Sequence, residues 1–549
     1  MKRLSVLFCV LCILITSCKK PQDINKSNLK YAEKLVGLKY SNMERDSLLG
    51  GLNVTLEDYE NNRKIQLENS ISPKIFFDPR PINYKNNEKQ VEIDWNIPTN
   101  TELPENRNDL AYYSISTLAS LVQQKKISSV ELTKFFISRL KKYGDTLECV
   151  VTITEELALK QAQKADEEIA KGIYRGPLHG IPYGVKDLFA VAGYKTTWGA
   201  APFKDQNIEY TAEVVKKLEE AGGVLVAKLT LGALAMGDVW YDGVTKNPWD
   251  LNQGSSGSSA GSASATAAGL VPFAIGTETW GSIVSPSTRC GVTGLRPTFG
   301  RVSRDGAMAL SWTMDKIGPI GRSANDCALV FDVIRGKDEK DQTTTDYPFN
   351  YYQNINLNEL KVGYLKDLFN REDYRGKEND SISIEVLKSL GVNFKEVGLP
   401  DDIEVYSLAI ILEAEAGAAF DELTRSNKDD ELVAQHEHAW PNIFRKSRFI
   451  PAVEYIQANR IRSILIEDFN KLIKDFDVIV CPTYGGGQLL MTNLTGHPCV
   501  VVPNGFDDKN HPTSISFIGN LYAEATILTF AKKYQENTDF EELHPDLFK

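Results

Sequence analysis

The segment 247–297 constrains this chain more than any other part of it. It reads NPWDLNQGSSGSSAGSASATAAGLVPFAIGTETWGSIVSPSTRCGVTGLRP, a Gly/Ser-rich loop followed by helix-forming residues at 263–268 and an apolar run at 271–275. A Gly/Ser tract alone is typical of a flexible linker, but this tract lies within patterned sequence. Small residues let backbone approach backbone and let amide N–H groups surround a reacting atom. The segment therefore predicts a packed, chemically useful loop.

The rest of the chain has the pattern of a soluble α/β protein. It has 549 residues, 42% hydrophobic and 25% charged, enough to bury a large core. Helical patterns at 155–171 and 211–221 alternate with apolar runs at 224–227 and 478–481, which predicts strands layered with helices. Residues 361–470 are acidic, and we expect them to be helical.

Charge and cysteine spacing exclude several classes. The formal net charge of −11, without a long basic run, disfavours nucleic acid as a partner. The cysteines after the N-terminal leader are scattered, odd in number and without Cys-x-x-Cys spacing, so they predict no disulfide framework and no metal site. These five are Cys149, Cys290, Cys327, Cys481 and Cys499.

The N-terminus is typical of an export signal. It has a basic start and an apolar stretch from Leu4 to Ile15, too short to be a good membrane span. Leu-Ile-Thr-Ser-Cys at 14–18 resembles the bacterial lipobox, which implies a lipoprotein signal peptide at 1–17 and Cys18 as the lipidated first residue of the mature protein. Cleavage elsewhere and a short anchor helix are the alternatives. Each version places the body outside the cytoplasm, lipid-anchored to a bacterial membrane in the first.

Residues 18–107 are predicted to form a polar N-terminal extension, and residues 108–549 the main domain. The extension has weak helical patterns followed by a Pro-rich run. It is either a spacer from the membrane or a belt packed on the main domain, and we assign it no chemistry.

Ordered motifs over 108–549 resemble the amidase signature family, the Ser-Ser-Lys amidohydrolases. That resemblance implies an α/β fold with a large mixed β-sheet core covered by helices on both faces. The matching segments are GPLHGIPYGVKD (176–187), GSSAGSA (257–263), GTETWGSI (276–283), CGVTGLRPTFGRVS (290–303), DKIGPIGRS (315–323) and NLTGHPCVVVPNG (493–505).

The same resemblance assigns the catalytic residues. Ser282 would be the nucleophile, Lys186 the base, and Ser258, after a cis Gly257–Ser258 peptide bond, would pass the proton between them. As a base Lys186 must be neutral, so its pKa must fall from about 10.4 toward 7. The expected oxyanion-hole donors are the backbone N–H groups of Thr279, Trp280, Gly281 and Ser282.

Histidine is a less suitable base in this sequence. Only His179 and His497 lie in the matching motifs, both in Gly/Pro turns, and we interpret both as structural. A competing Gly-x-Ser-x-Gly reading makes Ser259 the nucleophile, but that motif needs a strand directly before it. Residues 249–254 are too polar for a buried strand.

Two positions depart from the family pattern. Many members have glycine where this chain has Trp280, and many have arginine where it has Val284. The catalytic positions match, so these departures affect the expected substrate more than the expected reaction.

The predicted function is hydrolysis of a small-molecule or peptide amide through an acyl-enzyme. The resemblance implies no metal and no organic cofactor, and we expect no nucleic-acid partner. Three alternatives stay open: the amidase subunit of a tRNA-dependent amidotransferase, a non-catalytic binding lipoprotein with this fold, and an esterase.

Overall fold

An eleven-stranded mixed sheet organises most of the chain. The computed structural model describes residues 24–352, 354–372 and 374–549. In sheet order the strands are β1 (Val150–Ile153), β3 (Val224–Leu229), β2 (Pro182–Lys186), β8 (Phe273–Glu278), β10 (Lys316–Gly321), β9 (Thr293–Arg296), β14 (Cys499–Phe506), β15 (Pro512–Gly519), β13 (Val478–Pro482), β11 (Val362–Tyr364) and β12 (Phe394–Glu396).

Both strand directions occur in this sheet. Strand β2 is parallel to β3 and β8, and β11 is parallel to β12 and β13, whereas the other neighbouring pairs are antiparallel. Strands β2 and β8 therefore end at the same edge of the sheet, where Lys186 closes β2 and the 279–283 loop follows β8. Carboxyl ends of parallel strands are the usual place for a site in such a sheet.

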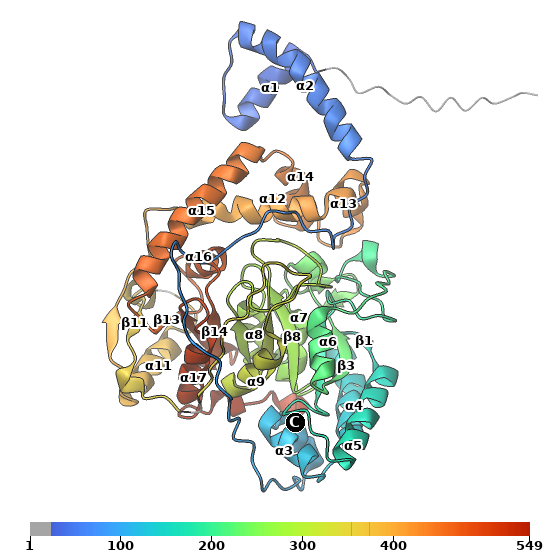
Figure 1. Cartoon of the computed structure of the whole chain (residues 1–549), viewed down its shortest axis with the longest axis vertical. Coiled ribbons are helices and arrows are strands. Elements are labelled where there is room, and N and C mark those ends of the chain that lie inside the picture. Colours follow the sequence, from blue (N-terminus) through green and yellow to red (C-terminus); the bar gives the residue numbers. More distant parts are fainter. Residues whose placement is uncertain (1–23, 353, 373) are drawn as a thin grey trace, which may run out of the picture. The chain divides into compact units, whose positions relative to one another are not determined.

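Helices cover both faces because alternate strand residues point in opposite directions. In β14, Val500 and Val502 join one apolar core, while Cys499 and Val501 join another. Helices α9 (Ala324–Ile334) and α17 (Glu524–Gln535) contribute to the first core, and α15 (Ala452–Ile473) and α16 (Gln488–Thr495) to the second (Figure 1). The predicted mixed sheet with helices on both faces is confirmed.

The remaining helices of the larger unit complete these layers. They are α3 (Ile115–Gln123), α4 (Ser129–Leu147), α5 (Glu155–Ala170), α6 (Glu213–Glu220), α7 (Ala260–Ala267), α8 (Val284–Cys290), α10 (Lys366–Phe369), α11 (Lys377–Ser389), α12 (Ile410–Ala419), α13 (Asp421–Arg425) and α14 (Trp440–Ser447).

One sequence expectation needs correction, and a second needs more detail. Residues 361–470 are not helical throughout, because strands β11 and β12 lie in this stretch, and three residues are too few to show a strand period. The segment before the Gly/Ser loop does form a strand, β7 (Asp250–Gly254), which pairs with β6 (Lys246–Asn247) outside the large sheet. Strand β7 is only half-buried, so the expectation that this segment forms no buried strand holds.

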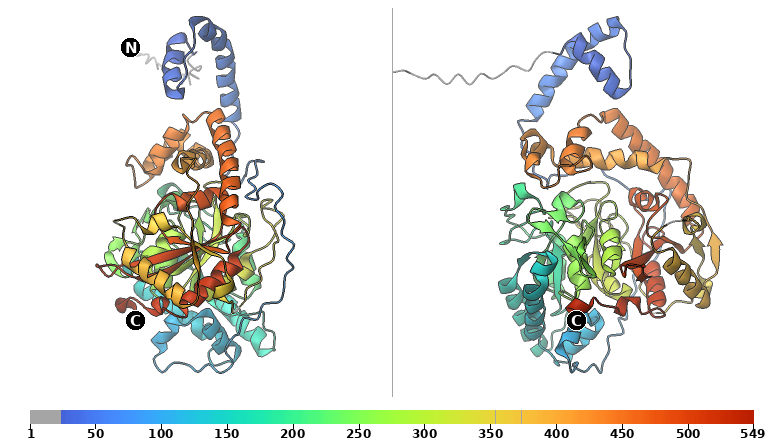
Figure 2. Two further views of the ribbon diagram at one scale, coloured as in Figure 1. Left: turned by 90° about the vertical axis from the view of Figure 1, so that its left-hand side faces the viewer. Right: turned by 180° about the vertical axis from the view of Figure 1, so that it is seen from behind.

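The Pro-rich part of the N-terminal extension packs on the larger unit, Asn69–Lys549. We call residues 69–98 the belt; it runs along the surface of that unit (Figure 2). The Trp95 ring stacks on Tyr351 at 5.5 Å between centroids, and Phe77 meets Phe299 edge-on at 5.0 Å. The extension was expected to be either a spacer or a belt packed on the main domain, and residues 69–98 pack as a belt.

The other unit ends at Glu68, and its described part is a pair of helices. Helices α1 (Lys26–Val36) and α2 (Asn42–Asn62) are joined by a two-pronged ion pair between Glu33 and Arg45, with N–O distances of 2.6 and 2.8 Å. The predicted signal peptide 1–17 and Cys18 lie outside the described residues. None of the helices in the described residues is both long and apolar enough to cross a bilayer.

Candidate active site

Lys186 is fully buried and surrounded by hydroxyl groups. Its Nζ lies 2.7 Å from the Ser258 hydroxyl, 2.8 Å from that of Thr277 and 3.2 Å from that of Ser259. Burial lowers the pKa of Lys186 well below its ordinary value, against the opposing charges of Asp315 and Glu278. The neutral amine that a general base needs is therefore favoured here.

The two serine segments meet beside this lysine. Ser258 is buried and follows a cis Gly257–Ser258 peptide bond, as the family resemblance implies. The next residue, Ser259, donates its backbone N–H to the Ser282 carbonyl at 3.1 Å. Ser282 is half-buried, and in the described residues its hydroxyl has no hydrogen bond to Lys186 or Ser258. Lys186 is thus hydrogen-bonded directly to Ser258. Ser282 is connected to this pair through its backbone carbonyl, which accepts the Ser259 N–H.

The 279–282 loop presents free backbone donors next to Ser282. Within the described part of the chain, no group accepts a hydrogen bond from the N–H groups of these four residues. Gly281 has a φ of +87°, a left-handed conformation that favours glycine. Consecutive N–H groups around such a residue form an anion-binding concavity. The loop can therefore stabilise an oxyanion, the role expected of it.

A buried carboxylate holds this loop in place. Glu278 accepts the N–H groups of Ile283 at 2.9 Å and Val284 at 3.0 Å, so it ties the end of β8 to the start of α8. Arg296 and Asn493 donate to its other oxygen at 3.0 and 2.8 Å. Burial would raise the pKa of Glu278, but Arg296 and these donors lower it below its ordinary value, so the carboxylate stays charged.

A second carboxylate fixes the loop from the other side. Asp315 accepts the Thr279 hydroxyl at 2.6 Å and the N–H groups of Leu310 and Ser311 at 2.8 and 2.9 Å. Burial raises the pKa of Asp315, and its hydrogen-bond donors oppose that rise. The 310–311 segment is thereby attached to the loop that carries Ser282.

The two departures from the family pattern have different surroundings. The Val284 side chain is buried in an apolar core, while its N–H bonds Glu278, so the loop keeps its support without an arginine. Trp280 is 37% exposed, and its ring lies 6.2 Å from that of Tyr406. The Trp280 side chain is therefore partly open to solvent.

The competing bases and nucleophile are occupied elsewhere. The His179 ring accepts the Arg175 N–H at 3.1 Å, and the His497 ring lies 2.8 Å from the Thr495 hydroxyl. Burial lowers the pKa of His497 to about 3. The Ser259 hydroxyl is buried, donates to the Thr277 carbonyl and accepts the Thr277 N–H, both at 3.1 Å. These contacts favour structural roles for all three.

Sequence reasoning missed the residues that support the site. Thr277 and Glu278 stand inside the GTETWGSI motif, and Arg296 and Asn493 inside two other motifs, but they were not singled out. Polar residues within otherwise small or apolar motifs were the available signal, because buried polar groups need partners. Asp315, in DKIGPIGRS, carried the same signal.

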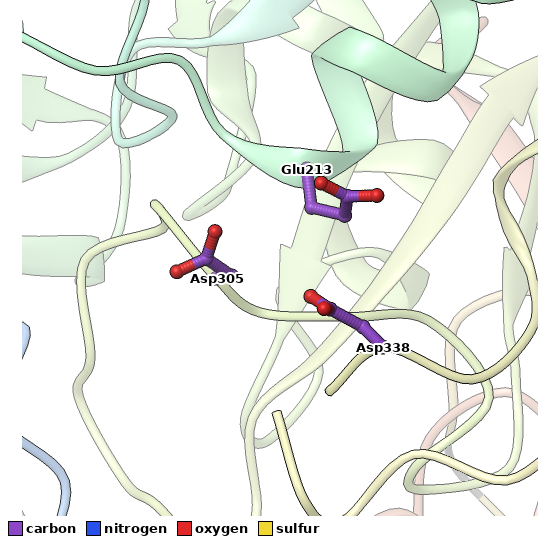
Figure 3. A group of neighbouring side chains, drawn as sticks. All are labelled: Glu213, Asp305 and Asp338. Atoms are coloured by element: carbon purple, nitrogen blue, oxygen red, sulfur yellow. The ribbon is translucent and has the colours of Figure 1, made fainter. Parts of the chain in front are cut away.

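Three other carboxylates gather away from these residues. Glu213, Asp305 and Asp338 have oxygen atoms within 4.8 Å of one another (Figure 3). Each already has a partner: Lys216 for Glu213, Lys340 for Asp305 and the Ser303 hydroxyl for Asp338. We assign no metal site to this acidic cluster.

Taken together, the buried lysine, the adjacent serines and the loop of free N–H groups form one site at the carboxyl ends of β2 and β8. The family model described as "Amidase" matches residues 131–490. The chain therefore belongs to the amidase family and is an amidase-signature amidohydrolase.

Individual relatives and structures agree with this family. The chain is 36% identical over 484 residues to a glutamyl-tRNA(Gln) amidotransferase subunit from Marinomonas sp. (strain MWYL1), covering 79% of this chain and 99% of that protein. Identity to the corresponding protein from Carboxydothermus hydrogenoformans is 34%, covering 80% and 100%. The native peptide amidase from Stenotrophomonas maltophilia is similar in structure, with a TM-score of 0.70, 27% identity and coverage of 79% and 98%.

Gly281→Ala tests the loop. A Cβ there would meet Leu489 Cδ2 at 3.1 Å in a backbone conformation that side chains disfavour, so the N–H groups should shift. Because losing one oxyanion donor costs about 10²–10³ in kcat, we expect kcat to fall by at least tenfold. Amide hydrolysis measured under saturating substrate checks this.

Gly172→Ala is the matched control. Gly172 has a φ of +81°, is exposed after α5 and has open space around its Cβ position. It should lose similar backbone stability without loss of kcat. Equal kcat values for the two variants would contradict the role of the loop.

Proposed function

We propose that this chain hydrolyses carboxylic amides through an acyl-enzyme, with Ser282 as nucleophile, Ser258 as proton carrier and Lys186 as base. One observation carries the proposal: the buried Lys186 amine has three hydroxyl oxygens around it. A neutral amine has two hydrogens and one lone pair. Ser259 already donates its proton to the Thr277 carbonyl and so accepts from the amine. With Thr277 accepting the second hydrogen, the lone pair faces Ser258.

The reaction follows from this arrangement. Ser282 Oγ forms a bond to the amide carbon as its proton passes to Ser258, whose own proton passes to Lys186. The oxyanion is held by the N–H groups of the 279–282 loop. As the C–N bond breaks, the protonated Lys186 returns the proton through Ser258 to the leaving amine. Water then attacks the acyl-enzyme by the same route and releases the acid. The missing Ser282 hydrogen bond is compatible with this, since catalytic hydrogen bonds often tighten only on substrate binding.

The amidotransferase function is the main alternative. The relatives at 34–36% identity are named as glutamyl-tRNA(Gln) amidotransferase subunits, and they support it. The N-terminal leader and the net charge of −11 favour a free hydrolase outside the cytoplasm, since a tRNA-dependent enzyme works on a polyanion. The similarity to a peptide amidase adds support for hydrolysis.

The other two alternatives are weaker. Burying a lysine is unfavourable because it opposes the charged form of the amine. A non-catalytic binding lipoprotein would have no need of a buried lysine at 2.7 Å from a buried serine. Esters are chemically easier acyl donors than amides, so esterase activity is expected as a side reaction of the same acyl-enzyme. We therefore retain amide hydrolysis as the primary function.

We also propose that the protein is exported and lipid-anchored through Cys18. Support comes from the basic start, the short apolar stretch and the lipobox-like residues 14–18. Lipid chains at Cys18 would hold the enzyme at a bacterial membrane, since each buried methylene contributes about 0.8 kcal/mol.

Replacement of the triad tests the mechanism. Ser282→Ala and Lys186→Ala should each lower kcat/KM by about 10⁴-fold or more, and Ser258→Ala by about 10²–10⁴-fold. The purified chain is assayed against a panel of simple amides, C-terminal peptide amides and free glutamine.

The exposed residues Ser138 and Lys160 supply matched controls, and Ser138→Ala and Lys160→Ala should leave turnover unchanged. Retained activity of Lys186→Ala at neutral pH would overturn the mechanism. Turnover of glutamine alone within the panel would favour the amidotransferase function.

The pH dependence of kcat/KM tests the state of Lys186. A base works when deprotonated, so activity should rise with pH through the pKa of Lys186 and then level off. Because burial lowers that pKa, the rise should lie well below the ordinary lysine value of about 10.4. Unfolding followed over the same pH range separates loss of activity from loss of fold. A rise centred at the ordinary lysine pKa would contradict a buried neutral base.

Cys18→Ala tests the anchor. The native protein should fractionate with membranes, and mass spectrometry of its N-terminal peptide should show acyl chains on Cys18. The variant should lose the acyl chains and its processing by the lipoprotein signal peptidase. An unmodified native N-terminus that begins at another residue would reject the proposal.

A further inference from the structure

A cavity lies beside the proposed catalytic residues. Its volume is about 120 Å³, it opens to solvent, and Thr277 and Thr279 form part of its lining. Thr277 contacts Lys186, and Thr279 belongs to the loop of free N–H groups. Ser282 does not line this cavity. The position of the cavity suits the part of a substrate that extends away from the reacting carbonyl.

The belt forms one wall of the cavity. Seven of the lining residues come from the belt segment 69–76, which we call the belt wall. Its first residue is fixed: Asn69 donates to the Ala309 carbonyl at 2.9 Å and accepts the Ala309 N–H at 2.7 Å. Ala309 lines the same cavity and directly precedes Leu310, which is bonded to Asp315. The belt wall is therefore connected to the loop that carries Ser282.

The belt wall presents apolar side chains that the fold does not bury. Ile75 is 61% exposed and Phe76 51% exposed, yet both line the cavity. The deeper lining adds buried apolar side chains, including Leu188, Met308 and Leu310. An apolar ligand group in this cavity would cover surface that is now in contact with water, which is favourable in proportion to its area.

Four charged residues in the lining form two ion pairs with one another. Arg304 binds Asp341 at 2.9 Å, and Lys340 lies 3.4 Å from Asp305. Asp315 is occupied by Thr279 and two backbone N–H groups. Lys316 donates to the Met314 carbonyl, and the exposed Lys74 has its Nζ 5.8 Å from the centre of the Phe76 ring. The buried charged groups are therefore satisfied without a charged ligand, so the inner part of the cavity suits a neutral, apolar group better than an ionic one.

We propose that the belt wall is part of the substrate pocket, and that Ile75 and Phe76 bind an apolar alkyl or aryl group at the far end of the amide substrate. This inference rests on the proposed amide hydrolysis. The family model begins only at residue 131, so the belt wall lies outside the part of the chain that the family model matches. Selectivity for the far end of the substrate would then come from a segment outside that match.

The test uses a double variant that carries Ile75→Ser and Phe76→Ser together. Ile82→Ser is the matched control, since Ile82 is an 80% exposed isoleucine of the same belt that does not line the cavity. Two substrates are compared: a short alkyl amide and a homologue with a long alkyl chain. Both substituted residues are largely exposed, so the fold should survive, which thermal unfolding checks.

For the long amide, kcat/KM of the double variant should fall about tenfold relative to the short amide, since apolar burial contributes about 25 cal/mol per Å². The loss should lie in KM, because these contacts are distant from the reacting atoms and equal in ground and transition states. The control should keep the native ratio. An unchanged ratio in the double variant, or an equal loss on both amides, overturns the inference.

A second measurement separates this inference from the proposed function. Alkyl fluorophosphonates with short and long chains react with an activated serine without requiring amide turnover. If the native chain hydrolyses neither these two amides nor any other amide of the panel described above, the proposed function fails. The belt wall is then judged from labelling rates alone: a preference of the native chain for the long probe that the double variant loses supports the pocket, and an unchanged preference rejects it.

Discussion

Burial of one amine is the constraint on which the rest of this site depends. A protonated lysine in the interior would need a charged partner or several strong acceptors, whereas Lys186 has only hydroxyl groups within hydrogen-bonding distance among the described residues. Hydroxyl groups both donate and accept hydrogen bonds, so they satisfy a neutral amine without carrying a charge that would favour its protonated form. The two acidic side chains nearby, Glu278 and Asp315, are hydrogen-bonded to other groups. Because its direct partners are hydroxyl groups and not carboxylates, Lys186 is favoured in its neutral form, which can accept a proton.

The two carboxylates have a different task, which is to shape the loop around Ser282. Glu278 fixes the residues after Ser282, the proposed nucleophile, and Asp315 fixes Thr279 before it. Backbone N–H groups between these anchors stay free to meet an oxyanion, and preorganised donors of this kind need no rearrangement during the reaction. The belt wall is connected to the same framework through Ala309 and Leu310.

Much of this could be predicted from the sequence, and the limits have physical causes. The positions of Lys186, Ser258 and Ser282 stand in motifs that are contiguous in the chain, and the helical and apolar periods predicted the layered fold. Strands β11 and β12 were missed because three residues show no period. Arg296 and Asn493 stand out as polar residues within largely apolar motifs, but their pairing with Glu278 could not be predicted, because contacts across the fold leave no mark in local spacing. The belt wall was invisible for the same reason, since only packing shows which cavity an extended segment lines.

The hydrogen bond between Asn493 and Glu278 spans 215 positions of the chain. A ribosome must therefore have added residue 493 before the support of the 279–282 loop is complete, although Ser282 itself was made long before. A chain that ends before residue 493 would contain Lys186, Ser258 and Ser282 and still lack this hydrogen bond. The geometry of the loop that carries Ser282 thus depends on a residue far along the chain.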